Sequence, residues 1–542
     1  MTELLLPAAL YAETHFRFFG WSPSALFRRE PEIVFDLPRR ITREADLPIV
    51  LMVNDAHLYP ICIESVQVTI SLGPLLFEFD QSAIQKSEID HLQRKQLQAY
   101  ILTVPRSELP PSGGEVFVNA CLRYRRIKNG TPQNKIYTVL NDNLITSTKF
   151  AFRCFIANDD YPGSDFCTFG DVHCHSIFSR SHVEWGPPLE VIDRMAAASG
   201  LSFVAVTDHS YDLACDPDNY LRQDKNLRLW KLYKSCIDNY KGTTVLMPGE
   251  EISVLNSRKK AVHLCGLGLS EYIPGTLDGA RRNIRGDRQL TIDEAIDEIE
   301  RQGGVSFAAH PGVKAGFMQR IFLRRGMWGA DDLCGKLGGI QAANGDFYES
   351  WKRGKNLWIS MIQKGRRIPI LGGSDAHGDF NRYRAIGIPF LQIHEAADRY
   401  MGFARTGIYG EKMSDAAGII SKIRDAATFV TNGPFVSICD SRRPEISLIG
   451  SKTIADKTNL CARAISTKEF GALGAIGVFM MTGTAGEKLI INEKLPPDTY
   501  DATIPIPTDA LSEGNSYLRV EAYGRTPRDL VTTAATSACF VE

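Results

Sequence analysis

This chain of 542 residues contains no CxxC motif and no long hydrophobic run. No segment approaches the ~18 consecutive apolar residues that a membrane-spanning helix requires, so we expect no membrane partner. The 12 cysteines are scattered from Cys62 to Cys539 without a CxxC pair, which favours reduced, buried thiols over a disulfide framework. The opening stretch MTELLLPAALYAETHF has no basic segment before its short apolar run and does not match a secretory signal. We therefore expect a cytoplasmic protein.

An excess of charge of either sign is missing as well. Lys and Arg total 62 against 63 Asp and Glu, which gives a formal net charge of −1. Nucleic-acid-binding surfaces are basic, and no basic stripe with interleaved aromatic residues is present, so we expect no nucleic-acid partner. The chain also has no GxGxxG motif, no P-loop and no GxSxG motif after a strand. We therefore expect a small-molecule partner. The composition does not decide whether the chain forms a homo-oligomer.

The two ends of the chain carry the alternating pattern of β-strands. Apolar residues recur at every second position in IESVQVTISLG and EVFVNACLRYR, and the turn-rich stretches PPSGG and KNGTPQN lie nearby. We expect residues 1–160 to form a β-rich, sandwich-like domain that contains one helix over about 82–100. The stretches AIGVFMM, KLIIN and SYLRVEAYG predict a second β-rich, sandwich-like domain over residues 438–542.

The middle of the chain, residues 161–437, has a different rhythm, in which short apolar runs alternate with amphipathic helices. PPLEVIDRMAAASG has prolines at its start and Gly200 after its end, an asymmetry typical of helices. TIDEAIDEIERQGG places Thr291 and Glu294 at the spacing of a capping box, and NLWISMIQKG predicts a third helix that ends at Gly365. Alternating strands and helices indicate a parallel sheet or barrel, so we expect an α/β fold here.

Seven apolar runs in this middle region each carry, at or near the end, a side chain that can bind a metal or form hydrogen bonds. In α/β barrels the carboxyl ends of the strands carry the active site. A single histidine after an apolar run usually packs in the core or lies in a loop, but here six of the 11 histidines fall on such runs. The groups delivered are His173, His175, Asp208, His209, Glu250, Glu251, His263, His310, Asn344, Asp375 and His377.

These side chains predict a metal centre. In GDVHCHS the alternate positions of a strand point Asp171, His173 and His175 to the same side. The set holds more ligands than the roughly four that one zinc ion takes, so we expect two or three divalent ions, and imidazole mixed with carboxylate suits zinc, manganese or iron. Clustered ions activate water and stabilise the oxyanion of a hydrolysed ester. This favours a metal-dependent hydrolase with a metal-bound hydroxide as the nucleophile.

The order of these motifs resembles a known family. DVHCHS, VTDHS, GEE, AVHL, AAHP and GGSDAH, in this order, look like the PHP (polymerase and histidinol phosphatase) metal-dependent hydrolases. The later stretch ATFVTNGPF and the β-rich flanks look closest to the carbaryl-hydrolase-like branch of that superfamily. The resemblance covers residues 168–437 and implies a distorted (β/α)7 barrel with a di- or trinuclear metal centre.

The resemblance also implies roles for individual residues. Glu251 would bridge two metals, and it is preferred over Glu250 because the motif of the family usually reads GxE. Glu251, Asp375 and His377 would be the catalytic groups. The first metal would be bound by His173, His175, Glu251 and Asp375, the second by Glu251, His263 and His310, and the third by His209 and His377.

The motifs leave the identity of one ligand of the third metal undecided. The family places another histidine, or in this branch often an aspartate, a few residues after the first pair. In SIFSRSHVEWG, Arg180 stands near the aspartate position, and His182 lies one place later than the usual histidine. We take His182 as the candidate ligand. The alternative is an exposed loop histidine and a site with two metals.

Further residues are expected to support the site. Asp171 and Asp208 should orient neighbouring ligands rather than bind metal. Asn344, Arg382 and Lys314 are candidates for binding an anionic substrate, and the alternative for either basic residue, favoured when it is taken alone, is a solvated surface charge. Tyr211 and Asp212 are candidates for a gating loop, and the pair Trp351 and Trp358 for the core.

The expected function is the hydrolysis of a small ester, with a phosphoester as the first choice. A carbamate or carboxyl ester is the alternative that the carbaryl-hydrolase-like branch suggests. A nuclease is disfavoured by the near-neutral charge. A non-catalytic metal-containing binding protein is the alternative from another class. Charge separates the ester classes, because a phosphomonoester normally meets Arg or Lys as well as metal.

Overall fold

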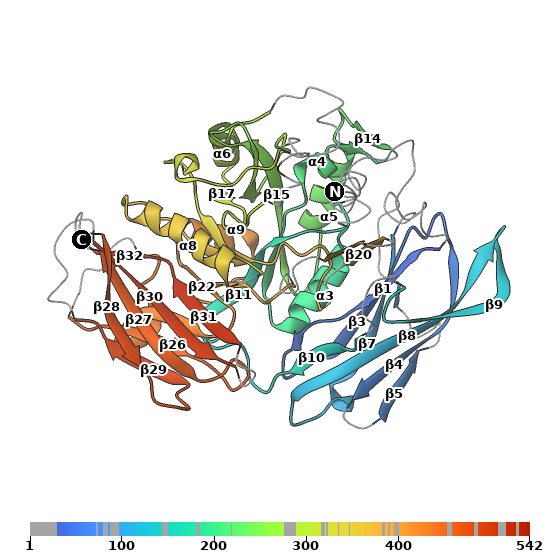
Figure 1. Cartoon of the computed structure of the whole chain (residues 1–542), viewed down its shortest axis with the longest axis horizontal. Coiled ribbons are helices and arrows are strands. Elements are labelled where there is room, and N and C mark those ends of the chain that lie inside the picture. The colour runs from blue at the N-terminus through green and yellow to red at the C-terminus, as the bar shows by residue number, and fades with distance from the viewer. Residues whose placement is uncertain are drawn as a thin grey trace.

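The computed structural model describes most of the chain. The fold is mixed α/β with more strand than helix, and three regions follow one another along the sequence (Figure 1). Two residues singled out in the sequence, His182 and Arg382, lie outside the described part. The described residues are 30–71, 74–79, 85–86, 97–143, 150–179, 185–217, 219–275, 289–315, 320, 324–333, 335–345, 347–381, 385–388, 391–394, 400–451, 458–481, 486–507, 516–526 and 530–541.

The N-terminal region is a sandwich of two sheets (Figure 1). Hydrophobic side chains from both sheets form one core between them. The first sheet has the order β1 (Glu32–Asp36), β3 (Leu47–Asn54), β7 (Leu97–Val104) and β6 (Gln85–Lys86). The second has the order β2 (Arg40–Ile41), β10 (Phe152–Ile156), β8 (Gly114–Lys128), β4 (Ile61–Ser71) and β5 (Pro74–Phe79), with β9 (Thr131–Leu140) paired to β8.

Alternation along the strands explains this core. In β8, Val116, Val118 and Ala120 are fully buried, and the residues between them face outwards. The strands predicted from IESVQVTISLG and EVFVNACLRYR are β4 and β8. The hairpin between β8 and β9 turns at Asn129 and Gly130, whose φ values of 53° and 78° suit a tight two-residue turn.

The helix predicted over residues 82–100 is wrong where the structure describes it. Residues 85–86 and 97–100 belong to strands β6 and β7, and the residues between them lie outside the described part. β7 buries Leu97 and Ala99 and pairs along its whole length with β3. Strand pairing and burial against distant residues outweigh the helical pattern of the local sequence.

The central region is built on a mixed sheet. Two sets of parallel strands, β11–β12–β15 and β17–β18–β19, are joined through β16, which runs antiparallel to both of its neighbours. The bounds are β11 Cys167–Cys174, β12 Phe203–Val206, β15 Val245–Leu255, β16 Ala261–Leu267, β17 Val305–Ala308, β18 Ile340–Asn344 and β19 Ile370–Gly373.

This sheet curls until its first and last strands meet at their carboxyl ends. There the Asp375 N–H donates to the His173 carbonyl at 2.8 Å, and the His175 N–H donates to the Ala376 carbonyl at 2.9 Å. Along the rest of its length β11 pairs instead with β22 (Arg405–Tyr409). The described strands therefore do not close into the complete (β/α)7 barrel that the resemblance implies.

Helices lie between several successive strands of the central sheet. α3 (Leu189–Ser199) starts after Pro188 and ends at Gly200, whose φ of 92° is favourable for glycine, as the sequence predicts. α6 (Ile292–Arg301) has the predicted capping box, because Thr291 Oγ1 accepts from the Glu294 N–H while the Glu294 carboxylate accepts from the Thr291 N–H.

The remaining helices are short to medium in length, and no helix of the described ranges is both long and apolar enough to cross a membrane. The helix predicted from NLWISMIQKG is α8 (Glu349–Ile362), which begins earlier than that stretch. The other elements of the region are α4 (Ser210–Leu213), α5 (Arg228–Asp238), α9 (Ala416–Arg424), and the two hairpins β13 (Cys215–Asp216) with β14 (Asn219–Gln223) and β20 (Ala385–Ile388) with β21 (Leu391–His394).

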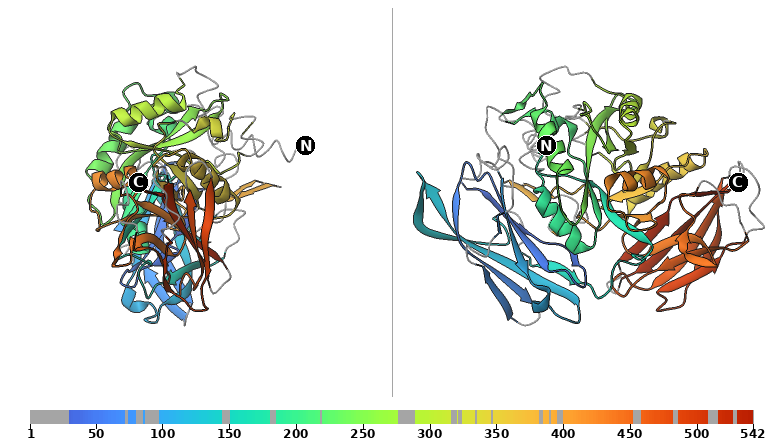
Figure 2. Two further views of the ribbon diagram at one scale, coloured as in Figure 1. Left: turned by 90° about the vertical axis from the view of Figure 1, so that its left-hand side faces the viewer. Right: turned by 180° about the vertical axis from the view of Figure 1, so that it is seen from behind.

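The C-terminal region is a second sandwich, and one of its sheets continues the central sheet. Figure 2 shows the two β-rich regions on opposite sides of the central one. Beyond β22 the central sheet runs through β23 (Thr428–Thr431), β31 (Val531–Thr536), β30 (Ser516–Arg525), β27 (Leu473–Met481) and β28 (Glu487–Lys494), with β32 (Cys539–Val541) paired to β30. The other sheet has the order β25 (Arg443–Ser447), β24 (Phe435–Asp440), β26 (Leu460–Ile465) and β29 (Asp501–Pro505).

Candidate metal centre

The predicted ligands that the structure describes converge on one buried site, which we call the central cluster. They come from strands and loops far apart in the sequence, and none exposes more than 12% of its side chain. His182 lies outside the described residues, so its predicted role stays a prediction. The members of the central cluster are His173, His175, His209, Glu251, His263, His310, Asp375 and His377.

Glu251 lies at the middle of the central cluster, and its two carboxylate oxygens contact different histidines. Oε1 contacts His310 Nε2 at 2.8 Å and also contacts His263 Nδ1. Oε2 contacts His209 Nδ1 at 2.9 Å. It also lies 3.4 Å from His175 Nε2 and 3.6 Å from His173 Nε2. One carboxylate therefore joins two sets of imidazoles, as a bridging ligand would.

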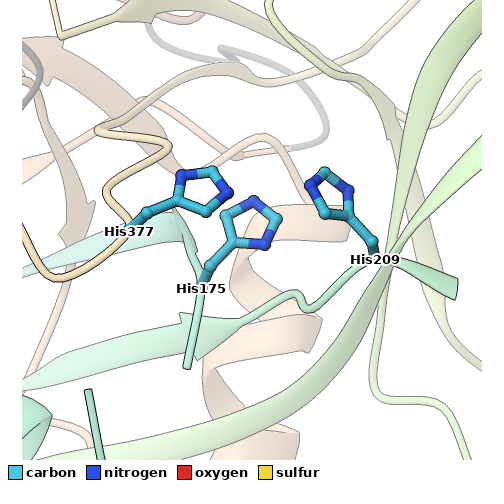
Figure 3. Close-up of side chains that lie close together, drawn as sticks. All are labelled: His175, His209 and His377. Carbon is cyan, nitrogen blue, oxygen red and sulfur yellow. The ribbon is translucent and has the colours of Figure 1, made fainter. Parts of the chain in front are cut away.

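Two groups within the cluster have metal-binding geometry. In each group, one ligand atom per residue lies within 4.8 Å of the ligand atoms of the others. Figure 3 shows the first group, with its three imidazole rings gathered together from three separate segments. The first group is His175, His209 and His377, and the second is His173, Glu251, His310 and Asp375.

Hydrogen bonds fix the tautomers of three of these histidines. His173 Nδ1 lies 2.9 Å from Gln341 Oε1, and His377 Nδ1 lies 3.1 Å from the Asp375 carbonyl. Both oxygens only accept hydrogen bonds, so each Nδ1 carries the proton. His175 Nδ1 lies 3.1 Å from the Ser179 hydroxyl, which donates its own proton to Asp208. In the neutral form of each ring, Nε2 is therefore the nitrogen that remains able to bind a metal.

This arrangement leaves a place for a cation. His173 Nε2 and His175 Nε2 lie only 3.3 Å apart inside the protein, so the two rings, when neutral, turn their lone pairs towards each other. His209 Nε2 is buried and has no hydrogen-bond partner among the described residues. Imidazole nitrogens and carboxylate oxygens are both metal ligands, and their convergence on one point fits a divalent metal ion.

The electrostatics of the cluster point in the same direction. Burial opposes the ionisation of Glu251, but the surrounding histidines outweigh it and hold the pKa of this carboxyl well below its usual range. Burial also opposes the charging of His175, yet contact with Asp375 and Glu251 raises its pKa to about 9. The pKa of His209 falls to about 3 through burial and the nearby His175. The carboxylates of the cluster thus favour positive charge nearby, but the low pKa of His209 shows that not every histidine ring can be protonated at once.

Backbone strain is concentrated at two of the ligands. His310 has φ of 34° and Asp375 has φ of 57°, values in the left-handed region that residues with a Cβ seldom adopt. Strain of this kind persists where the surrounding structure holds it in place, and it is common at functional sites. Both residues follow the ends of parallel strands, β17 and β19, and the strained step turns each side chain towards Glu251 and its neighbours.

The expectation that every ligand lies near the carboxyl end of a strand is wrong for β15 and β16. Glu251 stands inside β15, which continues to Leu255. His263 stands near the start of β16. Because β16 returns antiparallel from β15, with Ser253 opposite His263, the start of one strand lies beside the end of the other. The sequence gives the residues but not the direction of the strand.

The two aspartates expected to orient ligands hold backbone and hydroxyl groups. Asp208 accepts from the Ser176 N–H and hydroxyl at 2.8 and 2.6 Å, and from the Ser179 hydroxyl at 2.7 Å. Asp171 Oδ1 accepts from the N–H groups of His173 and Ser374, both at 3.0 Å. Asp171 therefore ties together the two segments that carry His173 and Asp375.

Gln341 is a supporting residue that the sequence did not reveal. It is fully buried on β18, where its amide nitrogen donates to Asn344 Oδ1 at 2.8 Å. Asn344 Nδ2 in turn donates to Asp375 Oδ2 at 3.3 Å. The chain Gln341–Asn344 thus links His173 to Asp375. Asn344 contacts a carboxylate of the cluster here, and its predicted contact with substrate stays a prediction.

Glu250, the neighbour of Glu251, lies outside the cluster. Its carboxylate accepts from the Ser210 hydroxyl at 2.8 Å, the Trp230 indole N–H at 2.7 Å and the Ile273 N–H at 3.2 Å. Burial nevertheless raises the pKa of Glu250 to about 8. The structure thus places Glu251, and not Glu250, among the histidines.

Arg325 is the second residue that the sequence did not reveal. Its guanidinium lies against the His263 ring, with Nη2 2.9 Å from Nδ1 and Nη1 in contact with Nε2. The segment that carries it is anchored to the start of β16, because the Gly326 N–H donates to the Ala261 carbonyl at 2.7 Å. No motif surrounds this arginine in the sequence, so only the fold brings it to the site.

Other residues singled out in the sequence have structural positions. Trp351 and Trp358 are buried in a hydrophobic core, as predicted. Tyr211 and Asp212 are buried in α4, where the Tyr211 ring stacks on His209 at 4.6 Å. Their predicted gating role is not tested by this position. Lys314 is exposed.

A large cavity lies away from the central cluster. Its volume is about 1110 Å³, and it is lined by residues near the amino ends of β12 and β15, among them Ser202, Thr244 and Tyr161. No member of the central cluster lines it. Because the chemistry requires the convergent ligands, we take the cluster and not this cavity as the candidate site.

Comparison with known proteins adds nothing to this geometry. No protein-family model matches the chain, and no curated protein matches it. The case for the site therefore rests on its own residues.

Proposed function

We propose that the chain is a metal-dependent hydrolase of a small anionic ester, with a phosphoester as its substrate class. The central cluster would hold two or three divalent ions of zinc, manganese or iron. We also propose that the chain belongs to the PHP hydrolases, in the carbaryl-hydrolase-like branch, and that its curled sheet corresponds to their distorted (β/α)7 barrel.

The observation that carries the proposal is the close approach of two ligand atoms, the Nε2 atoms of His173 and His175. Their Nε2 atoms are 3.3 Å apart, and their Nδ1 protons are engaged by Gln341 and Ser179. A structural hydrogen-bond network places donors against acceptors, whereas this site gathers acceptors around a common centre. Bound ions would supply Lewis acidity that activates water and stabilises negative charge on the ester.

The residues of the chain supply position and order. Glu251 presents Oε1 and Oε2 to different histidines, which would keep two ions at the short separation that an in-line displacement needs. Asp208 and Gln341 hold the rings of His175 and His173 through hydrogen bonds to Nδ1 or its partner. The Tyr211 ring covers one face of His209 and limits the access of bulk water there.

Arg325 supports an anionic substrate. Its guanidinium always carries a positive charge, and it lies against His263, a ligand candidate for one of the ions. Two positive groups this close repel each other, and an anionic substrate would add to the negative charge that Glu251 already places beside His263. A phosphate ester provides that charge and suits the fork of donors on arginine, whereas a neutral carbamate does not.

The test compares two aryl esters with the same leaving group, one a phosphate and one a neutral carbamate. We expect the phosphate to be hydrolysed faster, and Arg325→Met to lower its kcat/KM by about 10²-fold. The metal content should stay the same. Arg324→Met is the matched control, because Arg324 is exposed and adjacent in the sequence. Faster hydrolysis of the carbamate by the parent enzyme would overturn the substrate class and leave the metal centre standing.

A further inference from the structure

The C-terminal sandwich contains a pair of cysteines in direct contact. Cys439 lies on β24 and Cys461 on β26, and the two strands are antiparallel neighbours in which these residues stand directly opposite each other. Their Sγ atoms are 3.3 Å apart.

The register of the two strands suits a covalent link. The Ser441 N–H donates to the Asn459 carbonyl at 2.8 Å, and in an antiparallel pair such directly bonded positions recur every second residue. Cys439 and Cys461 are two positions further along, so their Cα atoms are expected about 5.5 Å apart. That spacing lies inside the roughly 4.4–6.8 Å range that disulfides span.

We propose that Cys439 and Cys461 form a reversible disulfide that braces the C-terminal sandwich, with a small-molecule disulfide such as glutathione disulfide as the oxidant. The proposal is independent of the metal centre. It departs from the sequence prediction of reduced thiols, because 22 positions separate the two cysteines and no sequence spacing marks them as a pair.

The chemistry is a two-step thiol–disulfide exchange. The Cys461 thiolate attacks one sulfur of glutathione disulfide, which forms a mixed disulfide and releases one glutathione thiolate. The Cys439 thiolate then attacks the Cys461 sulfur, which forms the Cys439–Cys461 bond and releases the second glutathione thiolate. The two protein thiols lose two electrons and two protons, and one glutathione disulfide becomes two molecules of glutathione.

The contact between the two thiols supports this order of attack. The hydrogen bond between them lowers the pKa of Cys461 and raises the pKa of Cys439. Cys461 is therefore the better first nucleophile. Both side chains are buried, with 0% and 1% exposed, so the first step requires the strands to open or takes place during folding.

The brace would act on a sheet that is connected to the central region. The Tyr409 hydroxyl on β22 donates to the Val436 carbonyl on β24, and Tyr409 packs against Phe435. A bond between β24 and β26 closes a loop that contains β25, and loop closure stabilises the folded state by restricting the unfolded chain. The expected effect is higher stability of the C-terminal sandwich when oxidised.

The experiment starts from the full chain, unfolded and reduced, and refolds it in a buffer of glutathione and glutathione disulfide. Refolding removes the barrier of burial. Free thiols are then counted under denaturing conditions, and peptides are mapped by mass spectrometry without reduction. We expect the count to fall from 12 to 10 and a single cross-linked peptide pair to contain Cys439 and Cys461. The oxidised protein should melt several degrees higher than the reduced protein.

The matched control is the double variant Cys439→Ala with Cys461→Ala, carried through the same refolding. It should keep its 10 remaining thiols and show no difference in melting between the two buffers. Twelve free thiols in the refolded parent protein would overturn the proposal, as would a loss of two thiols that maps to other cysteines. Because the decisive count uses the parent chain, the result does not depend on how the variant folds.

Discussion

Two buried clusters of charged groups in this protein have opposite patterns. In the C-terminal sandwich, Arg519 donates to Glu487 through Nε and Nη2, both at 2.6 Å, and also donates to Glu521. Lys355, on α8, donates to both oxygens of Glu521 at 2.8 Å. Two cations face two anions, and each carboxylate has its partners inside the protein. This group, the C-terminal network, is complete without any ligand.

The central cluster lacks that balance. Its imidazoles bring Nε2 atoms towards one another, as at His173 and His175, and a carboxylate lies beside these same nitrogens with no Lys or Arg between them. Both clusters contain fully buried charged groups, so burial alone does not distinguish a structural network from a site. What distinguishes the two clusters is whether hydrogen-bond donors meet acceptors or ligand atoms of the same kind meet one another. Donors that meet acceptors stabilise a fold, and acceptors that meet acceptors require a ligand.

The largest expected effect is at Glu251. Glu251→Gln keeps the volume of the side chain but removes the charge that joins the two sets of histidines. We expect hydrolytic activity to fall by several orders of magnitude and metal to be lost, measured by steady-state kinetics and elemental analysis. Glu250→Gln is the control, because its carboxylate contacts Ser210 and Trp230 instead, and its effect should be far milder. The reverse ranking would show that the wrong glutamate has been assigned.

The next largest effect is a loss of folding stability that is expected from the C-terminal network and not from the central cluster. Arg519→Met leaves Glu487 without its bidentate partner in a buried setting, and breaking a buried pair in this way costs about 3–5 kcal/mol. Denaturant unfolding should show this loss, while the folded protein keeps its full metal content. Arg301→Met removes an exposed ion pair and should change stability little. Loss of metal in folded Arg519→Met would mean that the two clusters are not independent.

How much of this could be read from the sequence depends on the range of the interactions. The ligands were predicted because each follows a local apolar run, and α3 and α6 were predicted from caps within a few residues. The antiparallel course of β16, which brings His263 beside Ser253 on β15, was not, because strand direction is set by pairing with distant residues. Gln341 and Arg325 have no local motif and become visible only when the fold brings them to His173 and His263.

Gln341 offers a smaller and more specific test. Gln341→Leu removes the acceptor of the His173 Nδ1 proton and frees the tautomer of that ring. Removing a partner of this kind costs 10–100-fold in metal affinity, on the order seen for other ligand-orienting residues. Metal titration with a competing chelator measures the change. An unaltered affinity would show that His173 keeps its orientation without Gln341.

The smallest expected effect is at His182. If this residue completes a third metal site with His209 and His377, His182→Ala should lower the metal content by about one equivalent and weaken activity without unfolding the chain. Elemental analysis together with a melting curve checks both parts. The same metal content and the same rate as the parent would identify His182 as a loop residue and leave a centre with two metals.

The most direct test of the central cluster is the metal content of the purified protein beside that of the double variant His173→Ala with His175→Ala. The variant removes the two adjacent Nε2 atoms and leaves the C-terminal network untouched. We expect two or three equivalents of a divalent transition metal in the parent, and at least one fewer in a variant that remains folded. A parent that stays metal-free after incubation with zinc, manganese or iron, or a variant with undiminished metal, would contradict the metal centre.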